Sequence, residues 1–265
     1  RHLQTRHSAA TQTDDFHMIR FLIFFLAQIS LSSFAMGENQ ANSVTIYAEW
    51  KMSLRADGKI AALELKPGRV RDVLRNELET AIRLWEFEPG SVNGVNAATD
   101  TTLIVQLTIS PNADGDGFSI VVDRAETGGA IETTGRMPAI SWAQAQGMKR
   151  DKGAKNLLVL LITYDESGVP EQIEVADESP IEKGLLVSDA IEAVRTWRFD
   201  PEHIDGKGLR ARALVPICYE FDTSDRSAAG CEWNSPYGNK AVPGRDSIVL
   251  DSSVTLKSDV IGKTL

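Results

Sequence analysis

The sequence is poor in the residues that build metal centres and covalent catalytic sites. Its 265 residues include two cysteines and four histidines, and His2, His7 and His17 all lie in the first seventeen positions. If this leader is removed, His203 alone remains, which excludes zinc sites built from several histidines. Neither a Gly-x-Ser-x-Gly nor a His-Glu-x-x-His motif occurs. We therefore expect no catalytic residues, no metal, no cofactor and no enzyme activity.

Positive charge is scarce as well. The chain has 28 Lys and Arg residues against 37 Asp and Glu residues, which gives a formal net charge of −9. Such an acidic protein repels phosphate backbones, so we expect no nucleic-acid partner. The densest cationic stretch, residues 149–155, favours a solvated linker over a polyanion-binding site. The hydrophobic share of 42% is nevertheless typical of a packed globular protein.

A short apolar run near the N-terminus has the layout of a secretory signal peptide. It spans Phe21–Ala27, follows the cation Arg20 and precedes Ser33-Phe34-Ala35, whose small residues fit a cleavage site. A membrane span needs about 20 mainly apolar residues, and this run is shorter. We predict a non-native leader over residues 1–17, a cleaved signal peptide over 18–35 and export from the cytoplasm. The alternative is a retained segment that anchors the protein in the inner membrane.

Export determines how the two cysteines are interpreted. Cys218 and Cys231 lie close together near the C-terminus, and a disulfide is the default for such a pair in an oxidising compartment. A catalytic thiol would need a base, and only His203 is available. We therefore predict a disulfide between these two residues.

The body of the chain contains a repeated pattern. Trp85-Glu-Phe87-Glu-Pro89 recurs 112 residues later as Trp197-Arg-Phe199-Asp-Pro201, and the turn at Asp57-Gly58 matches Ser167-Gly168 at an offset of 110. Such nearly constant offsets predict two copies of one supersecondary unit. We assign the copies to residues 44–125 and 155–221, with a linker at 126–154 and a polar C-terminal tail at 222–265.

Each copy has the pattern of two strands, a helix and a third strand. In the second copy, the apolar run 157–164 and the alternation at 173–175 predict a hairpin across Asp165–Gly168. An apolar stripe from Val187 to Trp197 predicts a helix with Ser188 as its N-cap. The first copy predicts strands at 44–54, 60–65, 101–109 and 118–123, and a helical stripe from Leu74 to Trp85. The predicted fold class is α+β, with two modules that each pack one helix on a short antiparallel sheet (β-β-α-β).

The second copy also carries a series of motifs in a specific order. They are the Gly168 turn, Trp197-Arg-Phe-Asp-Pro201, Asp205-Gly-Lys207 and Val215-Pro-Ile-Cys-Tyr-Glu-Phe221. In this order and spacing, residues 155–221 resemble the C-terminal domain of TonB, the energy-transducing protein of Gram-negative cell envelopes. Residues 44–109 look like a diverged copy. The resemblance implies the fold given above and a binding mode, because this family adds a short receptor segment to its sheet.

The chain departs from TonB in two respects. TonB has a retained N-terminal helix with a functional histidine and then a long Pro-rich spacer. No histidine lies within residues 19–36 here, and the ten prolines are scattered over the sequence. The resemblance therefore implies fold and binding mode more directly than energy transduction.

The closing strand of the second copy, Leu209–Phe221, is the candidate binding site. Pro216 removes a ladder donor, which predicts an edge strand or a bulge, and an edge strand can accept an extended peptide. Arg210 and Arg212 on one face suit an acidic peptide, although charged residues also keep edges soluble. A strand within Ser247–Leu256 could cover this edge. The predicted peptide-binding residues are Leu209, Arg210, Ala211, Arg212, Ala213, Leu214, Val215 and Pro216.

Two further features have simple structural interpretations. Asn112, Asp114, Asp116 and Asp123 have the spacing of calcium ligands, but the flanks read as strands, which favours a hairpin loop of turn residues. His203, between two aspartates, is predicted to be an exposed loop residue.

Taken together, the patterns predict a periplasmic protein that binds extended segments of envelope proteins by strand addition. Outer-membrane receptors are among the expected partners, which would link the protein to TonB-dependent transport. One alternative is a membrane-anchored, unconventional TonB-type energy transducer. Another is a structural envelope protein that self-associates, for example as a homodimer through its sheet edges.

Overall fold

The computed structural model describes residues 43–67, 72–112, 117–136, 138, 157–177, 179, 181–219, 233–234, 240–241 and 247–265. The predicted leader, the predicted signal peptide, most of the predicted linker and Cys231 lie outside these residues. The described part is mostly antiparallel sheet and contains helices α2 (Asp72–Ile82) and α4 (Leu185–Val194). The predicted α+β class is therefore confirmed.

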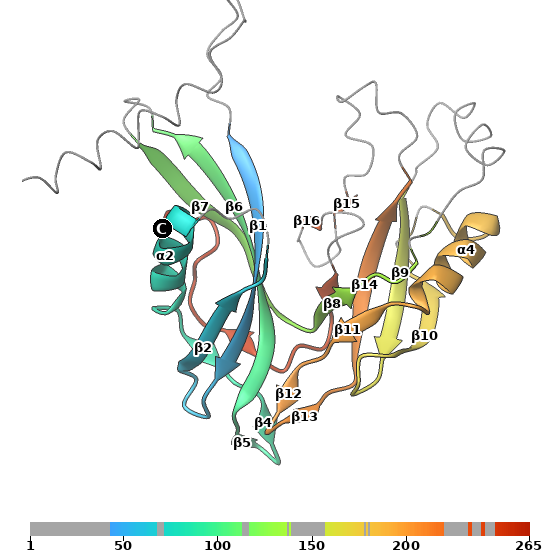
Figure 1. Ribbon diagram of the computed structural model, residues 1–265, viewed down its shortest axis with the longest axis horizontal. Helices are drawn as coiled ribbons and strands as arrows, with labels where there is room; N and C mark the ends of the chain where they lie inside the picture. Colours follow the sequence, from blue (N-terminus) through green and yellow to red (C-terminus); the bar gives the residue numbers. More distant parts are fainter. Residues whose placement is uncertain are drawn as a thin grey trace, which may run out of the picture. The chain divides into compact units, whose positions relative to one another are not determined.

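One sheet is built around a long central strand. It contains β1 (Val44–Leu54), β2 (Ile60–Leu65), β6 (Thr99–Pro111), β7 (Phe118–Gly128), β12 (His203–Ile204) and β13 (Lys207–Gly208). The order is β13-β12-β6-β1-β2, and β7 pairs with β6 beyond β12 (Figure 1). Both β6 and β7 are longer than the predicted strands 101–109 and 118–123, because the pairing of β6 with β1 runs along the whole of β1 and β7 follows β6 as far as Thr102.

The core of this sheet follows from alternation along β1. Trp50, Met52 and Leu54 point to one face and are at most 2% exposed, as residues two apart in a strand should be. The stripe of α2 packs against this face through Leu78 and Ile82, each 1% exposed. Burying one such side chain contributes about 1.5–3 kcal/mol, so this face accounts for much of the local stability.

The second sheet is covered on both faces. It contains β9 (Leu157–Tyr164), β10 (Pro170–Val175), β14 (Ala211–Cys218) and β17 (Ile248–Val249), in the order β10-β9-β14-β17. The even-numbered residues of β9 pack with α4, and Leu157 and Val159 pack on the opposite side with Ile248. This two-sided burial explains why the run 157–164 is apolar throughout rather than alternating.

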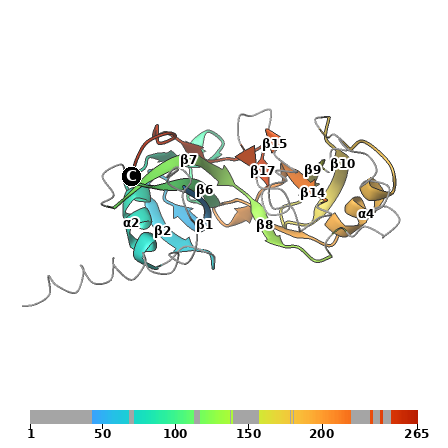
Figure 2. The same ribbon diagram turned by 90° about the horizontal axis from the view of Figure 1, so that it is seen from above.

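Short strands connect the two sheets. They are β3 (Phe87–Glu88), β8 (Ala130–Thr133), β11 (Arg198–Asp200) and β18 (Thr255–Leu256). The chain continues from β7 into β8 (Figure 2), and β8 pairs with β11. It also continues from β17 into β18, which pairs with β3. The segment predicted as a linker thus begins with the end of β7 and includes a paired strand. The segment predicted as a polar tail contains β17 and β18.

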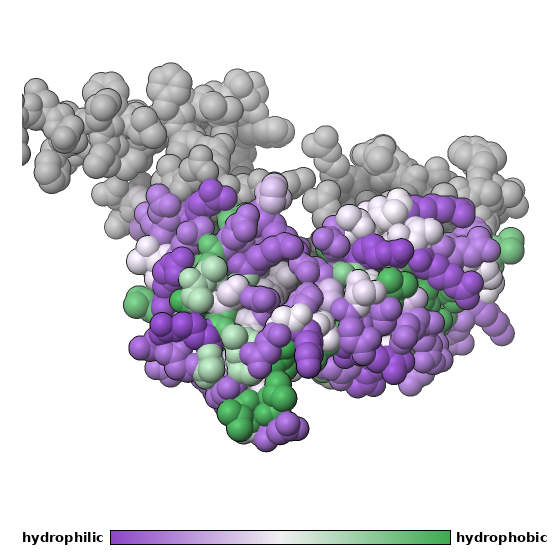
Figure 3. Space-filling view, turned by 60° about the horizontal axis from the view of Figure 1, so that its bottom comes forward, coloured by the Kyte–Doolittle hydropathy of each residue, from purple (hydrophilic) through white to green (hydrophobic). Residues whose placement is uncertain are grey.

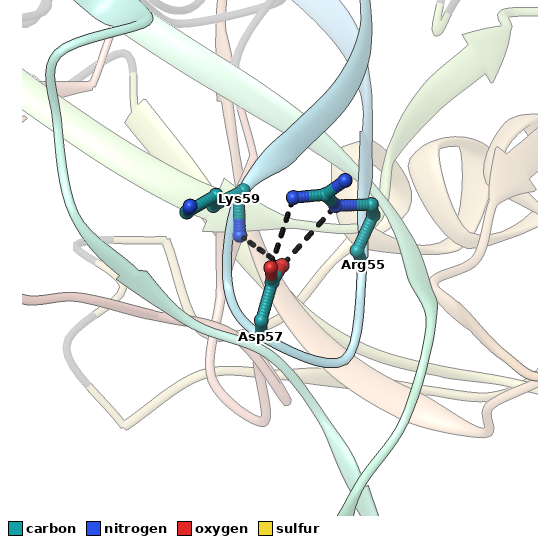
Figure 4. Close-up of polar contacts among 3 residues, drawn as sticks. All are labelled: Arg55, Asp57 and Lys59. Carbon is teal, nitrogen blue, oxygen red and sulfur yellow. Dashed lines mark hydrogen bonds and ion pairs between the residues drawn. The ribbon is translucent and has the colours of Figure 1, made fainter.

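The turn between β1 and β2 shows how a polar residue fixes a hairpin (Figure 4). The Asp57 carboxylate accepts a hydrogen bond from the Lys59 backbone N–H at 3.1 Å and forms an ion pair with the Arg55 guanidinium at 2.9 Å. These contacts, led by the Lys59 N–H, lower the pKa of Asp57. Gly58 has φ +79, and a Cβ there would lie 2.2 Å from the Phe87 carbonyl oxygen. Both its backbone angle and its surroundings therefore require glycine.

The start of α4 differs from the prediction. The helix begins at Leu185 after Gly184, which makes no side-chain cap, so Ser188 lies inside the first turn and is not the N-cap. Its hydroxyl instead lies 3.4 Å from the Gly184 carbonyl oxygen. The predicted apolar stripe is confirmed, because Val187, Ala190 and Val194 are buried. A Ser signal inside a helix is ambiguous, since the hydroxyl can also bond back to the preceding turn.

Two short hairpins differ sharply in exposure. The hairpin of β4 (Ser91–Val92) and β5 (Val95–Asn96) carries Val92 and Val95, which are 45% and 69% exposed. Apolar side chains are also visible on the face of the molecule drawn in Figure 3. In contrast, Ile204 of the β12–β13 hairpin is 8% exposed, because that hairpin pairs with β6.

Candidate functional site

The predicted binding residues lie together at the start of one strand. Ala211–Pro216 belong to β14, and Leu209 and Arg210 precede it. The strand is shorter than the predicted range Leu209–Phe221. Along it, Ala211 and the residues from Ala213 to Pro216 are buried while Arg212 is exposed.

Backbone direction along β14 separates an inner from an outer edge. The Leu250 N–H donates to the Arg212 carbonyl oxygen at 2.8 Å, so the backbone groups of Arg212 point away from β9. Because these groups alternate in an antiparallel strand, Leu214 and Pro216 point the same way. The missing N–H of Pro216 therefore falls on the outer edge, and the ladder with β9 loses no hydrogen bond.

The outer edge is partly occupied by the chain itself. β17 pairs antiparallel with β14 through Ala213↔Val249 and Leu214↔Ile248. Over these residues β14 is an internal strand rather than the edge strand that Pro216 predicts. The strand predicted within Ser247–Leu256 is present as the two short pieces β17 and β18, and β17 covers the candidate site, as the sequence allowed.

An acidic residue accompanies the added strand. The Arg212 guanidinium forms two hydrogen bonds with the Asp251 carboxylate, each 2.8 Å long, and the Arg212 backbone N–H donates to the same group at 3.1 Å. The side-chain hydrogen bond from Arg212 lowers the pKa of Asp251. Arg210 pairs with Glu171 of β10 at 2.9 Å. Both arginines thus form ion pairs with acidic side chains of the chain itself.

A groove lies on the other side of β17. Its volume is about 290 Å³, and it is lined by β7, β17 and β18. Among the described residues, β17 pairs with no strand other than β14. Backbone pairing therefore holds β17 from one side, while the Val249 side chain lies against Gly128 of β7, where an added Cβ would come within 2.6 Å of it.

A buried carboxylate, Glu202, lies where the C-terminal segment leaves β17, and sequence reasoning missed it. It is 4% exposed and accepts hydrogen bonds from the Thr101 hydroxyl at 2.6 Å, the Ser253 backbone N–H at 2.6 Å and the Ser252 hydroxyl at 3.2 Å. Burial, and then the charge of Glu202, raise the pKa of Tyr164. The Pro201-Glu202-His203 sequence gives no signal of this role.

Among the residues that the structure describes, the remaining candidates make separate contacts. Asp114 and Asp116 lie outside the described residues, while the Asn112 N–H donates to the Gly117 carbonyl oxygen at 3.1 Å and closes the β6–β7 hairpin. Asp123 accepts a hydrogen bond from the Thr108 hydroxyl at 2.6 Å. His203 lies in β12 rather than in a loop and is partly buried. Cys218 ends β14, and because Cys231 is outside the described residues the disulfide stays a prediction.

No helix in the described part of the chain has the length and apolar character that a membrane crossing requires.

Comparison with known proteins gives one match. No curated protein and no solved structure matches the chain. The family model described as "Gram-negative bacterial TonB protein C-terminal" matches residues 148–221, less than a third of the chain, and this range contains β9, β10, α4 and β14. Residues 148–221 are therefore similar to the TonB C-terminal domain family.

Proposed function

We propose that this protein acts in the Gram-negative periplasm and binds extended segments of other envelope proteins by strand addition at the outer edge of β14. The observation that carries the proposal is β17: the edge already accepts a short antiparallel strand, and an acidic residue next to that strand pairs with Arg212. Main-chain hydrogen bonds would supply affinity, and side-chain contacts would supply selectivity. Outer-membrane receptors are natural candidates for the partner, in keeping with the family.

We also infer that the two sheets are copies of one module. Leu54 pairs with Thr99 in the first sheet, and Tyr164 pairs with Ala211 in the second, so the registers agree at the sequence offsets of 110 and 112. Gly58 and Gly168 both have φ +79. A Cβ at Gly168 would lie 1.9 Å from the Phe199 carbonyl oxygen, the contact that Gly58 makes with Phe87. These equivalences support duplication of the whole unit, including its turn.

A crosslinking experiment tests the proposed binding edge. A photo-reactive residue replaces Arg210, whose side chain is 57% exposed, in the full mature chain, and a matched protein carries it at the exposed Glu182. The proteins are incubated with envelope extract, and crosslinked peptides are sequenced. We expect extended segments to crosslink at position 210 only, with increased amide protection along β14. Binding without new protection anywhere in Leu209–Phe221 would contradict the proposal.

A structural, self-associating role is the second candidate. It is favoured by the cover on the edges of β6 and β14, because β7 and β17 occupy positions where a partner strand would add. In that case copies would join through β2 and β10, the end strands of the two sheets. Light scattering over a concentration series distinguishes the two: a stable oligomer that binds no peptide supports the structural role.

A further inference from the structure

β6 and β14, the corresponding strands of the two sheets, differ in how firmly their outer edges are covered. β7 covers β6 through ten residue pairs, from Thr102 to Pro111. β17 covers β14 through two, at Ala213 and Leu214. A cover of two residue pairs can open locally at far lower free energy than one of ten, because local openings scale with the contacts they break.

The contacts of β17 and the residues that follow it with β9 and β14 divide into three kinds. Ile248 is 3% exposed and packs among apolar side chains of β9 and β14. Backbone hydrogen bonds continue the ladder as far as the Leu250 N–H. The Arg212–Asp251 pair closes the end of the strand, with side chains 52% and 39% exposed. Apolar filling, ladder bonds and an ion pair are also the features by which a separate peptide would be recognised on a sheet edge.

The segment that follows β17 is anchored independently. Glu202 holds the Ser253 N–H at 2.6 Å, and β18 pairs with β3 through Thr255 and Leu256. Release of β17 from β14 therefore leaves these contacts in place. The local geometry gives β17 the properties of a tethered segment that can vacate the edge without unfolding its neighbours.

We propose that β17 is a built-in competitor for the peptide-binding edge, and that the partner which displaces it carries the same chemistry. This inference rests on the proposed strand addition at β14. The partner segment has an apolar residue that enters the place of Ile248 and, three positions later, an acidic residue that pairs with Arg212. Because the competitor is tethered, its effective concentration is high, and a partner must match or exceed its contacts to bind.

The test uses the full mature chain and a fluorescent peptide that copies Ser247–Ser252. Asp251→Asn weakens β17 but leaves β14 and Arg212 unchanged, and Ile248→Ser combined with it weakens β17 further. We expect Asp251→Asn to raise peptide affinity about fivefold, which corresponds to loss of a partly exposed ion pair, and the double variant to raise it more. Asp259→Asn, in the same segment and with its side chain 84% exposed, is the charge-matched control and should change nothing.

Two readouts separate failure of this inference from failure of the proposed function. A peptide with Asn in place of its Asp should lose its advantage, and adding Arg212→Gln to the weakened chain should remove the preference for the acidic peptide. If the weakened chains keep their fold, bind other extended segments at β14, and bind this peptide no better than the natural chain, β17 is not a competitor although strand addition stands. If none of the chains binds any extended peptide at β14, the proposed function itself is wrong. Circular dichroism and the exchange of β9 amides verify the fold of each variant.

Discussion

Replacement of Glu202 should destabilise the protein in a graded manner. Its carboxylate is almost fully buried and accepts three hydrogen bonds, two of them 2.6 Å long. Glu202→Ala leaves the Thr101 hydroxyl and the Ser253 N–H without this acceptor, and each unsatisfied buried donor costs about 1–3 kcal/mol. We expect a loss of about 2–4 kcal/mol in the free energy of unfolding. Glu202→Gln keeps one acceptor oxygen for Ser253, and the hydroxyls can rotate to accept from its amide, so we expect a loss of about 1 kcal/mol.

Urea denaturation followed by tryptophan fluorescence measures both variants, because Trp50 and Trp197 are fully buried. Glu182→Ala and Glu182→Gln are the matched controls, since this residue is exposed, and they should stay within about 0.5 kcal/mol of the natural chain. Amide exchange should rise around Ser253 in Glu202→Ala. Variants of Glu202 that are as stable as the controls would refute the role of this carboxylate as the anchor of the C-terminal segment.

Three other predictions concern the repeat and the added strand. Gly206→Ala, with φ +75 and open space around it, should cost about 1–2 kcal/mol, whereas Gly168→Ala, with φ +79 and a backbone oxygen 1.9 Å from the added Cβ, should cost clearly more. Thermal melts compare the two. Ile204→Ala should cost about 2–4 kcal/mol and Val92→Ala less than about 0.5 kcal/mol, since the first side chain is 8% and the second 45% exposed; equal losses in urea titrations would contradict this difference. The lowered pKa of Asp251 implies that its contribution is complete above its ordinary value of 3.8 and is lost as pH falls through the lower folded value; amide protection factors in β17 should therefore decline in that acidic window, and should be flat there in Asp251→Asn.

Local patterns in the sequence predict the individual elements well. Each of three patterns reflects whether one face of the element or both faces are buried, and the observed burial confirms them. They are the alternation along β1, the apolar run of β9 and the helical stripe from Leu74 to Trp85. The predicted start of α4 was wrong because a serine hydroxyl inside a helix can bond to the carbonyl oxygen of the preceding turn as readily as it can cap a helix N-terminus. The lengths of β6 and β7 were underestimated because polar residues at strand ends carry no periodic signal, and only pairing with a neighbour extends them.

The arrangement around the candidate site could be predicted only in part. Pro216 and the arginines indicate an outer edge on β14, and the structure places the proline's missing donor there. What covers that edge depends on a strand of two residues, 34 positions beyond the residue it pairs with (Leu214↔Ile248). Such a short strand has no period of its own to detect. The buried Glu202 was missed for a similar reason, because its partners Thr101, Ser252 and Ser253 are distant in sequence and ordinary in type.

The way in which the chain connects β7 and β17 to the strands they cover explains why the edges of β6 and β14 are covered so differently. β7 is joined directly to β6 by a hairpin, so its pairing extends along that strand with little loss of chain entropy. β17 reaches β14 only after a connection of 29 residues, from Tyr219 to Ser247, and it must then leave for β18 on the other sheet. Only two residues therefore pair with β14 before Glu202 accepts the hydrogen bond from the Ser253 N–H. On the mechanism we propose, a short cover held between a long connection and a fixed anchor would allow this edge, rather than the edge of β6, to exchange its own strand for a partner's.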